Sequence, residues 1–96
     1  MKKLVYISGP ITGHEDYKQE FDYAADKLIS DGYTVVNPAR IDDVMPNAKY
    51  EEYMKADMLL LGICDCIYML KCWEKSCGAN REYGYALAKG KEIMFE

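Results

Sequence analysis

The chain has 96 residues, of which 50% are hydrophobic and 29% are charged, and its net charge is −4. A chain of this length forms one domain, residues 1–96, and the mixture is that of a globular protein, which excludes a disordered or collagen-like chain. Because 12 basic residues stand against 16 acidic ones and form no cluster, we expect no nucleic-acid partner.

Two further classes of protein are disfavoured by the apolar pattern. No stretch reaches the roughly 18 apolar residues that a membrane span requires. The first residues, Met1, Lys2 and Lys3, lead directly into a strand pattern and not into the apolar core of a signal peptide. We therefore expect a cytoplasmic protein without a membrane partner.

Four cysteines crowd into one short part of the chain, at Cys64, Cys66, Cys72 and Cys77. Their spacing matches neither a CxxC pair nor a zinc ribbon. We expect free thiols in a reducing compartment in preference to a metal site.

The first part of the chain predicts a strand, a helix and a second strand. Leu4–Ile7 is a short apolar run that Gly9 and Pro10 close, as is typical of a buried parallel strand. A helix ending at Gly32 follows, and its apolar residues recur at steps of three and four: Tyr17, Phe21, Ala24, Ala25 and Leu28. Tyr33–Val36 is the second strand.

The second part continues the alternation. Residues 38–48 hold two prolines and two aspartates and are expected to form a loop. A helix from about Lys49 leads to a third strand, Cys66–Leu70. After a loop, Ser76 is the expected N-cap of a last long helix, whose predicted apolar positions are Ala79, Tyr83, Ala86 and Leu87. Gly90 ends this helix before a strand over Glu92–Phe95.

Strands that alternate with helices in this order indicate an α/β fold. We expect a small doubly wound parallel sheet of about four strands, joined by three helices in right-handed crossovers. Such sheets bind ligands beyond the carboxyl ends of their strands, where the strand order reverses. In a sheet this small that point lies beside the first strand.

The loop after the first strand therefore falls at the expected ligand site. It contains Gly9, Pro10, Ile11 and Gly13. Glycines allow a ligand to approach the backbone, whose N–H groups can hold hydroxyls or phosphate. A tight turn from strand to helix explains the same residues. The loop has neither the Walker nor the G-x-G-x-x-G pattern.

Two acidic residues and one helix start are further candidates. Asp57 lies in the apolar stripe of its helix, where a carboxylate needs a partner or a raised pKa, unless it turns to solvent at the boundary. Ser76 and Gly78 begin the next helix, and a helix N-terminus attracts anions. Glu82 lies further along that helix at the margin of its stripe, and spacing alone favours a solvated charge there.

These motifs together resemble the nucleoside 2-deoxyribosyltransferase family. The resemblance includes relatives that hydrolyse deoxynucleoside monophosphates and, more closely, small uncharacterised phage and bacterial proteins. It is carried by "YISGPITG" after the first strand and by Asp57 eight residues before Asp65. Its third part is "S-x-G-x-x-x-E-x-G-x-A", formed by Ser76, Gly78, Glu82, Gly84 and Ala86.

The resemblance implies a flavodoxin-like fold and a role for each matching residue. Glu82 would be the nucleophile that attacks C1′ of the sugar, and Asp57 would orient the sugar or assist proton transfer to the base. Tyr6 would orient Glu82. Gly9 and Ile11 would line the sugar and base pocket, and Ser76 and Gly78 would hold a 5′-phosphate. No cofactor or metal is implied, and the family suggests a homo-oligomer.

Some features depart from the family pattern. Its transferases complete their pocket with a carboxy-terminal segment of a neighbouring subunit, whereas this sequence ends at Glu96 directly after its last strand, which argues against base exchange and the usual oligomeric arrangement. Trp73 either stacks on a base or lies in an apolar patch or subunit contact. His14 is expected to be a surface loop residue, with a phosphate contact as the alternative.

The sequence thus favours cleavage or transfer of an N-glycosidic bond of nucleosides or their 5′-monophosphates through a covalent glycosyl-glutamate. The alternative is a non-catalytic module of the same fold that binds or senses nucleotides. A flavin carrier is least favoured, because the first loop lacks a hydroxyl-rich phosphate-binding run.

Overall fold

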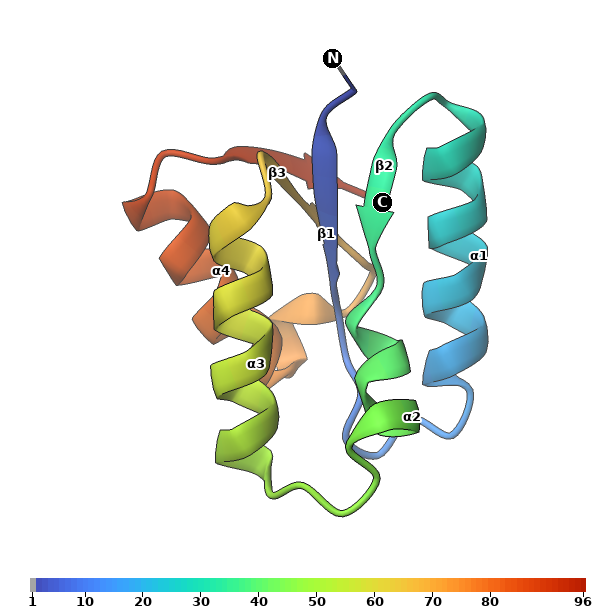
Figure 1. Ribbon diagram of the computed structural model, residues 1–96, viewed down its shortest axis with the longest axis vertical. Coiled ribbons are helices and arrows are strands. Elements are labelled where there is room, and N and C mark those ends of the chain that lie inside the picture. The colour runs from blue at the N-terminus through green and yellow to red at the C-terminus, as the bar shows by residue number, and fades with distance from the viewer. Residues whose placement is uncertain (1) are drawn as a thin grey trace.

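The structure is a computed structural model that describes residues 2–96. Strands and long helices alternate along the chain (Figure 1). The strands are β1 (Leu4–Ser8), β2 (Thr34–Val36), β3 (Cys66–Met69) and β4 (Glu92–Phe95). The long helices are α1 (Tyr17–Ser30), α3 (Tyr50–Ile63) and α4 (Cys77–Ala88). The predicted α/β fold is confirmed.

The four strands form one parallel sheet in the order β2-β1-β3-β4. Tyr6 in β1 lies between Val36 of β2 and Ile67 of β3. The chain adds β2 at one edge of β1 and then adds β3 and β4 at the other edge, so the strand order reverses between β1 and β3. This is the predicted switch point.

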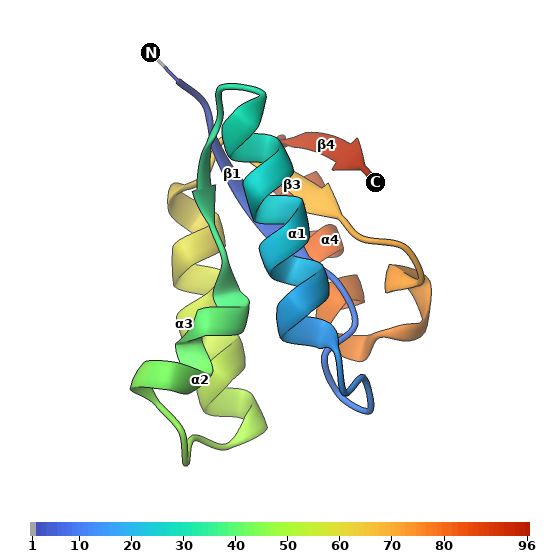
Figure 2. The same cartoon turned by 90° about the vertical axis from the view of Figure 1, so that its right-hand side faces the viewer.

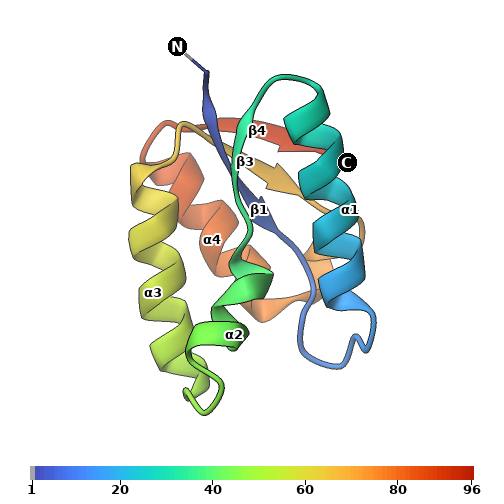
Figure 3. The ribbon, with the colours of Figure 1, turned by 45° about the vertical axis from the view of Figure 1, so that its right-hand side comes forward.

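The helices cover the two faces of the sheet unequally. Figures 2 and 3 show α1 on one face and α3 with α4 on the other. Since side chains alternate along a strand, Val5 and Ile7 of β1 pack in the core beneath α1, while Tyr6 belongs to the core beneath α3 and α4. The buried residues of both cores have almost no exposed surface.

The segment between β2 and α3 differs from the loop that the sequence predicted. Pro38–Arg40 form a 3-10 turn, and α2 (Ile41–Val44) is a single helical turn. The side chain of Asn37 accepts a hydrogen bond from the backbone of Ala39, and proline occupies the first helical position. An Asn cap followed by proline favours a helical turn, and this local signal outweighs the loop-like composition of residues 38–48.

The predicted ends of the long helices are confirmed. The hydroxyl of Ser76 caps α4 by accepting a hydrogen bond from the backbone N–H of Ala79. Gly32 and Gly90 follow α1 and α4 with φ of 98° and 70°, in the left-handed region that favours glycine. Within residues 2–96, no helix combines the length and the apolar character that crossing a membrane needs.

Candidate functional site

A cleft of about 700 Å³ opens beyond the carboxyl ends of β1 and β3. Its walls come from five segments: the loop after β1, the first residue of α1, the turn at residues 38–41, helix α3, and residues 75–82 at the start of α4. It is lined by Gly9, Pro10, Ile11, Thr12, His14, Tyr17, Pro38, Ala39, Ile41, Tyr50, Tyr53, Met54, Asp57, Lys75, Ser76, Cys77, Gly78, Ala79 and Glu82. This cleft therefore lies at the switch point, where α/β sheets bind ligands.

Glu82 places a carboxyl group in this cleft although its side chain is only 5% exposed. The hydroxyl of Tyr6 donates a hydrogen bond to its Oε2 at 2.5 Å. The hydroxyl of Ser8 donates to its Oε1 at 2.6 Å. Both oxygens of the carboxyl group thus have a donor from β1, and each oxygen retains a lone pair for another contact.

The spacing of the two donors follows from the geometry of a strand. Tyr6 and Ser8 are two residues apart, so they project from the same face of β1, and that face is covered by α4. Both side chains are buried, Tyr6 completely and Ser8 to 1% exposure. The strand thus presents two fixed hydroxyl groups to one helix residue.

Asp57 supplies a second carboxyl group to the cleft from α3. Its side chain is 8% exposed. Among residues 2–96, its Oδ1 is the buried side-chain oxygen or nitrogen for which no hydrogen-bond partner is found. Buried polar atoms in folded proteins nearly always have a partner, so an unpaired oxygen at a cleft wall marks a position prepared for a bound group.

Burial dominates the electrostatics of the pair. It raises the pKa of Glu82 to about 7, against the opposing hydrogen bonds from Ser8 and Tyr6 and with a further increase from the charge of Asp57. Burial also raises the pKa of Asp57 to about 6, which the nearby Tyr6 hydroxyl lowers in part. Burial and the two carboxylates raise the pKa of Tyr6 well above its usual value, so this phenol remains a donor. Carboxyl groups tuned toward neutral pH are typical of functional sites.

The start of α4 forms one end of the cleft. Ser76 and Gly78 line it, together with Cys77 and Lys75. The first N–H groups of a helix have no acceptor within the helix, and the positive end of the helix dipole is added to the charge of Lys75. This end of the cleft is the more suitable one for an anionic group.

The first loop occupies its predicted place with one difference. Gly9, Pro10 and Ile11 line the cleft, whereas Gly13 is not among the lining residues and has a φ of 81° in a turn. A Cβ atom on Gly9 would lie 2.8 Å from the Cβ of Leu70. Gly9 is therefore required by packing against the residue after β3, a reason that the sequence did not suggest. His14 is exposed, as expected, and also lines the cleft.

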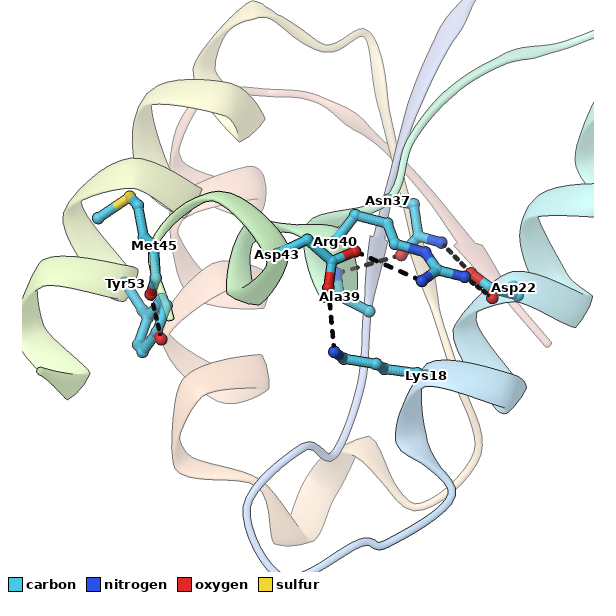
Figure 4. A network of polar contacts seen from close by, with 8 residues as sticks. All are labelled: Lys18, Asp22, Asn37, Ala39, Arg40, Asp43, Met45 and Tyr53. Atoms are coloured by element: carbon cyan, nitrogen blue, oxygen red, sulfur yellow. Dashed lines mark hydrogen bonds and ion pairs between the residues drawn. The ribbon is translucent and has the colours of Figure 1, made fainter. Parts of the chain in front are cut away.

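The wall formed by residues 38–41 is fixed from both sides (Figure 4). The guanidinium group of Arg40 pairs with Asp22 of α1 and with Asp43, and Asp43 also pairs with Lys18. On the other side, the hydroxyl of Tyr53 donates to the backbone oxygen of Met45 at 2.6 Å. These contacts connect the wall to α1 and to α3.

Trp73 lies outside the cleft. Its ring packs against Tyr83 at a centroid distance of 4.6 Å and near Phe95 at 6.3 Å. Of the two interpretations that the sequence left open, the structure shows the apolar patch and not a position for stacking on a base in the cleft.

The cysteines are all free, with Cys64 and Cys66 buried and Cys72 and Cys77 exposed. In the described part of the chain, no group of three or more His, Cys, Asp or Glu side chains is arranged to hold a metal ion.

Sequence reasoning selected Asp57 and Glu82, which line the cleft, and Tyr6, which donates a hydrogen bond to Glu82, but it missed several residues of the site. Ser8 was not considered as a site residue, although its two-residue spacing from Tyr6 within a strand would have placed both hydroxyls on one face. Other residues missed were Tyr17, Tyr50, Tyr53, Met54 and Lys75. Tyr17 was predicted only as an apolar position of its helix.

Comparisons with known proteins agree with this architecture. Residues 3–95 match the family described as "Domain of unknown function (DUF4406)". No curated protein matches the chain. Among solved structures, a 2-desoxiribosyltransferase from Leishmania mexicana superposes with a TM-score of 0.75 at 22% sequence identity. The match covers 97% of this chain and 63% of that one, so this chain spans less than two thirds of the solved protein. At this identity the match demonstrates a common fold.

Proposed function

We propose that this chain, which belongs to the DUF4406 family, cleaves the N-glycosidic bond of nucleosides or nucleoside 5′-monophosphates with Glu82 as the nucleophile. One observation carries the proposal. A buried carboxyl group, held by two hydroxyl donors, lies in a large cleft beside a second carboxyl group with an unpaired oxygen. A deoxyribosyltransferase with the same fold supports it.

The first step requires Glu82 in its ionised form. One carboxylate oxygen attacks C1′ of the sugar, and the bond between C1′ and the base nitrogen breaks with its electron pair passing to the base. Positive charge that develops at C1′ is stabilised by the same carboxylate. Tyr6 and Ser8 fix the side chain during the attack, which preserves the alignment on which such steps depend.

The departing base needs a proton, because a free base anion is a poor leaving group. Asp57 is the other carboxyl group that lines the cleft, and its pKa, raised to about 6, increases the fraction that carries a proton near neutral pH. In the second step a water molecule attacks C1′ of the glycosyl ester and transfers its proton to Asp57. The products are the free sugar and the original carboxyl pair. A second base in place of water would complete a transfer instead.

The same cleft separates the parts of a nucleotide. The start of α4 with Ser76, Gly78 and Lys75 suits a 5′-phosphate. Ile11 and the tyrosines of the opposite walls provide apolar surface for a base. The proposed ligand is therefore a nucleoside or its monophosphate, and the enzyme needs no organic cofactor for this chemistry.

The test is a panel of deoxynucleosides, ribonucleosides and their 5′-monophosphates, with base release followed by chromatography. Glu82→Ala should lower release on the order of 10³-fold or more, and Asp57→Asn roughly 10²- to 10⁴-fold. Glu20→Gln, an exposed residue of α1, is the matched control and should behave as the wild type.

Two outcomes contradict the proposal: no release from any substrate, or full activity in Glu82→Ala. Thermal stabilisation by a nucleotide without release, unchanged in Glu82→Gln, would indicate the non-catalytic binding module instead. Mass spectrometry of the protein after incubation with a slow substrate should find the sugar on the peptide that contains Glu82.

A further inference from the structure

We propose that Ser8 is a positioning residue, whose hydroxyl favours the ionised form of Glu82 and holds its side chain in one rotamer. The inference rests on the proposed role of Glu82 as nucleophile and extends it to a residue that contacts no substrate.

The geometry gives Glu82 and Asp57 unequal surroundings. Each oxygen of Glu82 accepts one short hydrogen bond, from Tyr6 and from Ser8. Oδ1 of Asp57 has no partner. A hydrogen-bond donor stabilises the charged form of a carboxyl group, so Tyr6 and Ser8 oppose the effect of burial on Glu82 and favour its ionised form. The ionised form is the one that a nucleophile requires.

Ser8 is the donor that distinguishes the two carboxyl groups. Tyr6 lies close to both of them and contributes to the electrostatics of both. The hydroxyl of Ser8 bonds to Glu82 alone. Ser8 is also 1% exposed, so its hydroxyl is shielded from solvent. Removal of this one donor should therefore raise the pKa of Glu82.

Other titratable groups near the pair come from every neighbouring element. Arg81 precedes Glu82 on α4 and lowers its pKa slightly. The remaining groups line the same cleft and are His14, Tyr17, Tyr50, Tyr53, Lys75 and Cys77. None of them is exchanged in the variants below, so a change in the titration of Glu82 reports on Ser8.

The experiment is a ¹³C NMR titration of side-chain carboxyl groups in wild type, Ser8→Ala and Ser8→Cys, with Glu82 assigned by its loss in Glu82→Gln. A hydrogen bond to a charged group should correspond to a shift of roughly one pH unit or more. We expect the Glu82 titration to move upward by that amount in Ser8→Ala. Ser8→Cys keeps the volume with a weaker donor and should give an intermediate shift. Ser30→Ala, an exposed serine at the end of α1, should give no shift.

The titration separates the inference from the proposed function because it needs no turnover. If Glu82 titrates identically in wild type and Ser8→Ala, Ser8 is only a packing residue and the inference fails, whatever the activity. If the titration moves but wild type releases no base, the proposed function fails and the effect of Ser8 on the pair stands. If wild type is active, the acidic limb of its pH profile should move upward in Ser8→Ala, with activity recovered at higher pH. An unmoved limb would also contradict the inference.

Discussion

The two faces of the sheet use the same strands for opposite purposes. Beneath α1, the core consists of apolar side chains such as Val5, Ile7, Phe21 and Leu28. Beneath α3 and α4, the core also encloses Ser8, Asp57 and Glu82, which are the buried polar residues of the described chain. Buried apolar surface stabilises a fold, whereas buried carboxyl groups cost stability unless they are paired.

Strand β1 makes this division possible because its successive side chains point to opposite faces of the sheet. Val5 and Ile7 face one side, and Tyr6 and Ser8 face the other. A small domain has little stability to lose. The free-energy cost of burying carboxyl groups falls on one face of the sheet, and the apolar core of the other face offsets it. The comparison teaches that α1 contributes an apolar core and exposed ion pairs at the cleft wall, whereas α3 and α4 contribute the buried carboxyl groups. Substitutions on the two faces should therefore differ in kind.

The largest effect on stability is expected beneath α1. Phe21 is 1% exposed in that core. Phe21→Ala should lower the free energy of unfolding by about 3–5 kcal/mol, through lost burial and a cavity. Urea denaturation measures this value. Tyr23→Ala, on the same helix and 72% exposed, is the matched control and should change it little. A similar cost for both variants would contradict the assignment of the α1 face as the supporting core.

On the face beneath α3 and α4, replacement of a buried carboxyl group is expected to raise the free energy of unfolding, by an amount that depends on pH. The pKa of Glu82 is raised from 4.5 to about 7, so the folded state binds a proton more tightly than the unfolded state. The contribution of Glu82 to stability is fully present below pH 4.5 and is lost as the pH rises through 7, by about 3 kcal/mol for this shift. The pKa of Asp57 is raised from 3.8 to about 6, so its contribution to stability is also lost as the pH rises through this range.

Glu82→Gln should remove the contribution of Glu82. The difference in unfolding free energy between variant and wild type should be small at pH 4 and increasingly in favour of the variant up to about pH 7. Taking this difference cancels the titration of exposed carboxylates. A variant that is less stable than wild type at pH 8 would show that ionised Glu82 stabilises the fold, which contradicts the comparison.

A smaller effect on stability is expected at the loop after β1. Gly9→Ala places a Cβ atom 2.8 Å from the Cβ of Leu70, a contact that requires the backbone to move and should cost roughly 1–3 kcal/mol, as overpacking does. Gly84→Ala is the matched control, because its Cβ meets nothing within 4 Å. In the middle of α4 it should stabilise by up to about 1 kcal/mol. Opposite signs in thermal denaturation confirm the packing role of Gly9.

The sequence predicted the elements well because periodicity and glycine caps are local signals. It predicted Leu87 as part of the apolar stripe of α4, whereas the side chain is 53% exposed. The 3-10 turn and the short helix α2 were missed because the two prolines and two aspartates of residues 38–48 indicated a loop. The error at Leu87 concerns which face of a helix is covered, and that depends on packing between distant segments.

The site was predicted only in part, for a similar reason. By spacing alone Glu82 was expected to be a solvated charge, and the family resemblance, not the pattern, selected it. The structure buries it because α4 crosses directly over Tyr6 and Ser8. A contact between residues 74 positions apart leaves no mark in local periodicity, so Ser8 could be recognised as its partner only from the fold.

The smallest effect is expected where charges are exposed. Arg40 connects Asp22 with Asp43 at the cleft wall, and all three side chains are at least 37% exposed (Figure 4). Exposed ion pairs contribute little because water and salt screen them. Arg40→Gln should lower Tm by a few degrees at most, and the difference should shrink in about 1 M NaCl. Lys27→Gln, an exposed lysine of α1, is the control. A large and salt-independent loss of Tm in Arg40→Gln would mean that this surface network supports the fold as the α1 core does. Burial alone would then not distinguish the parts of the molecule that support the fold from the parts that form the site.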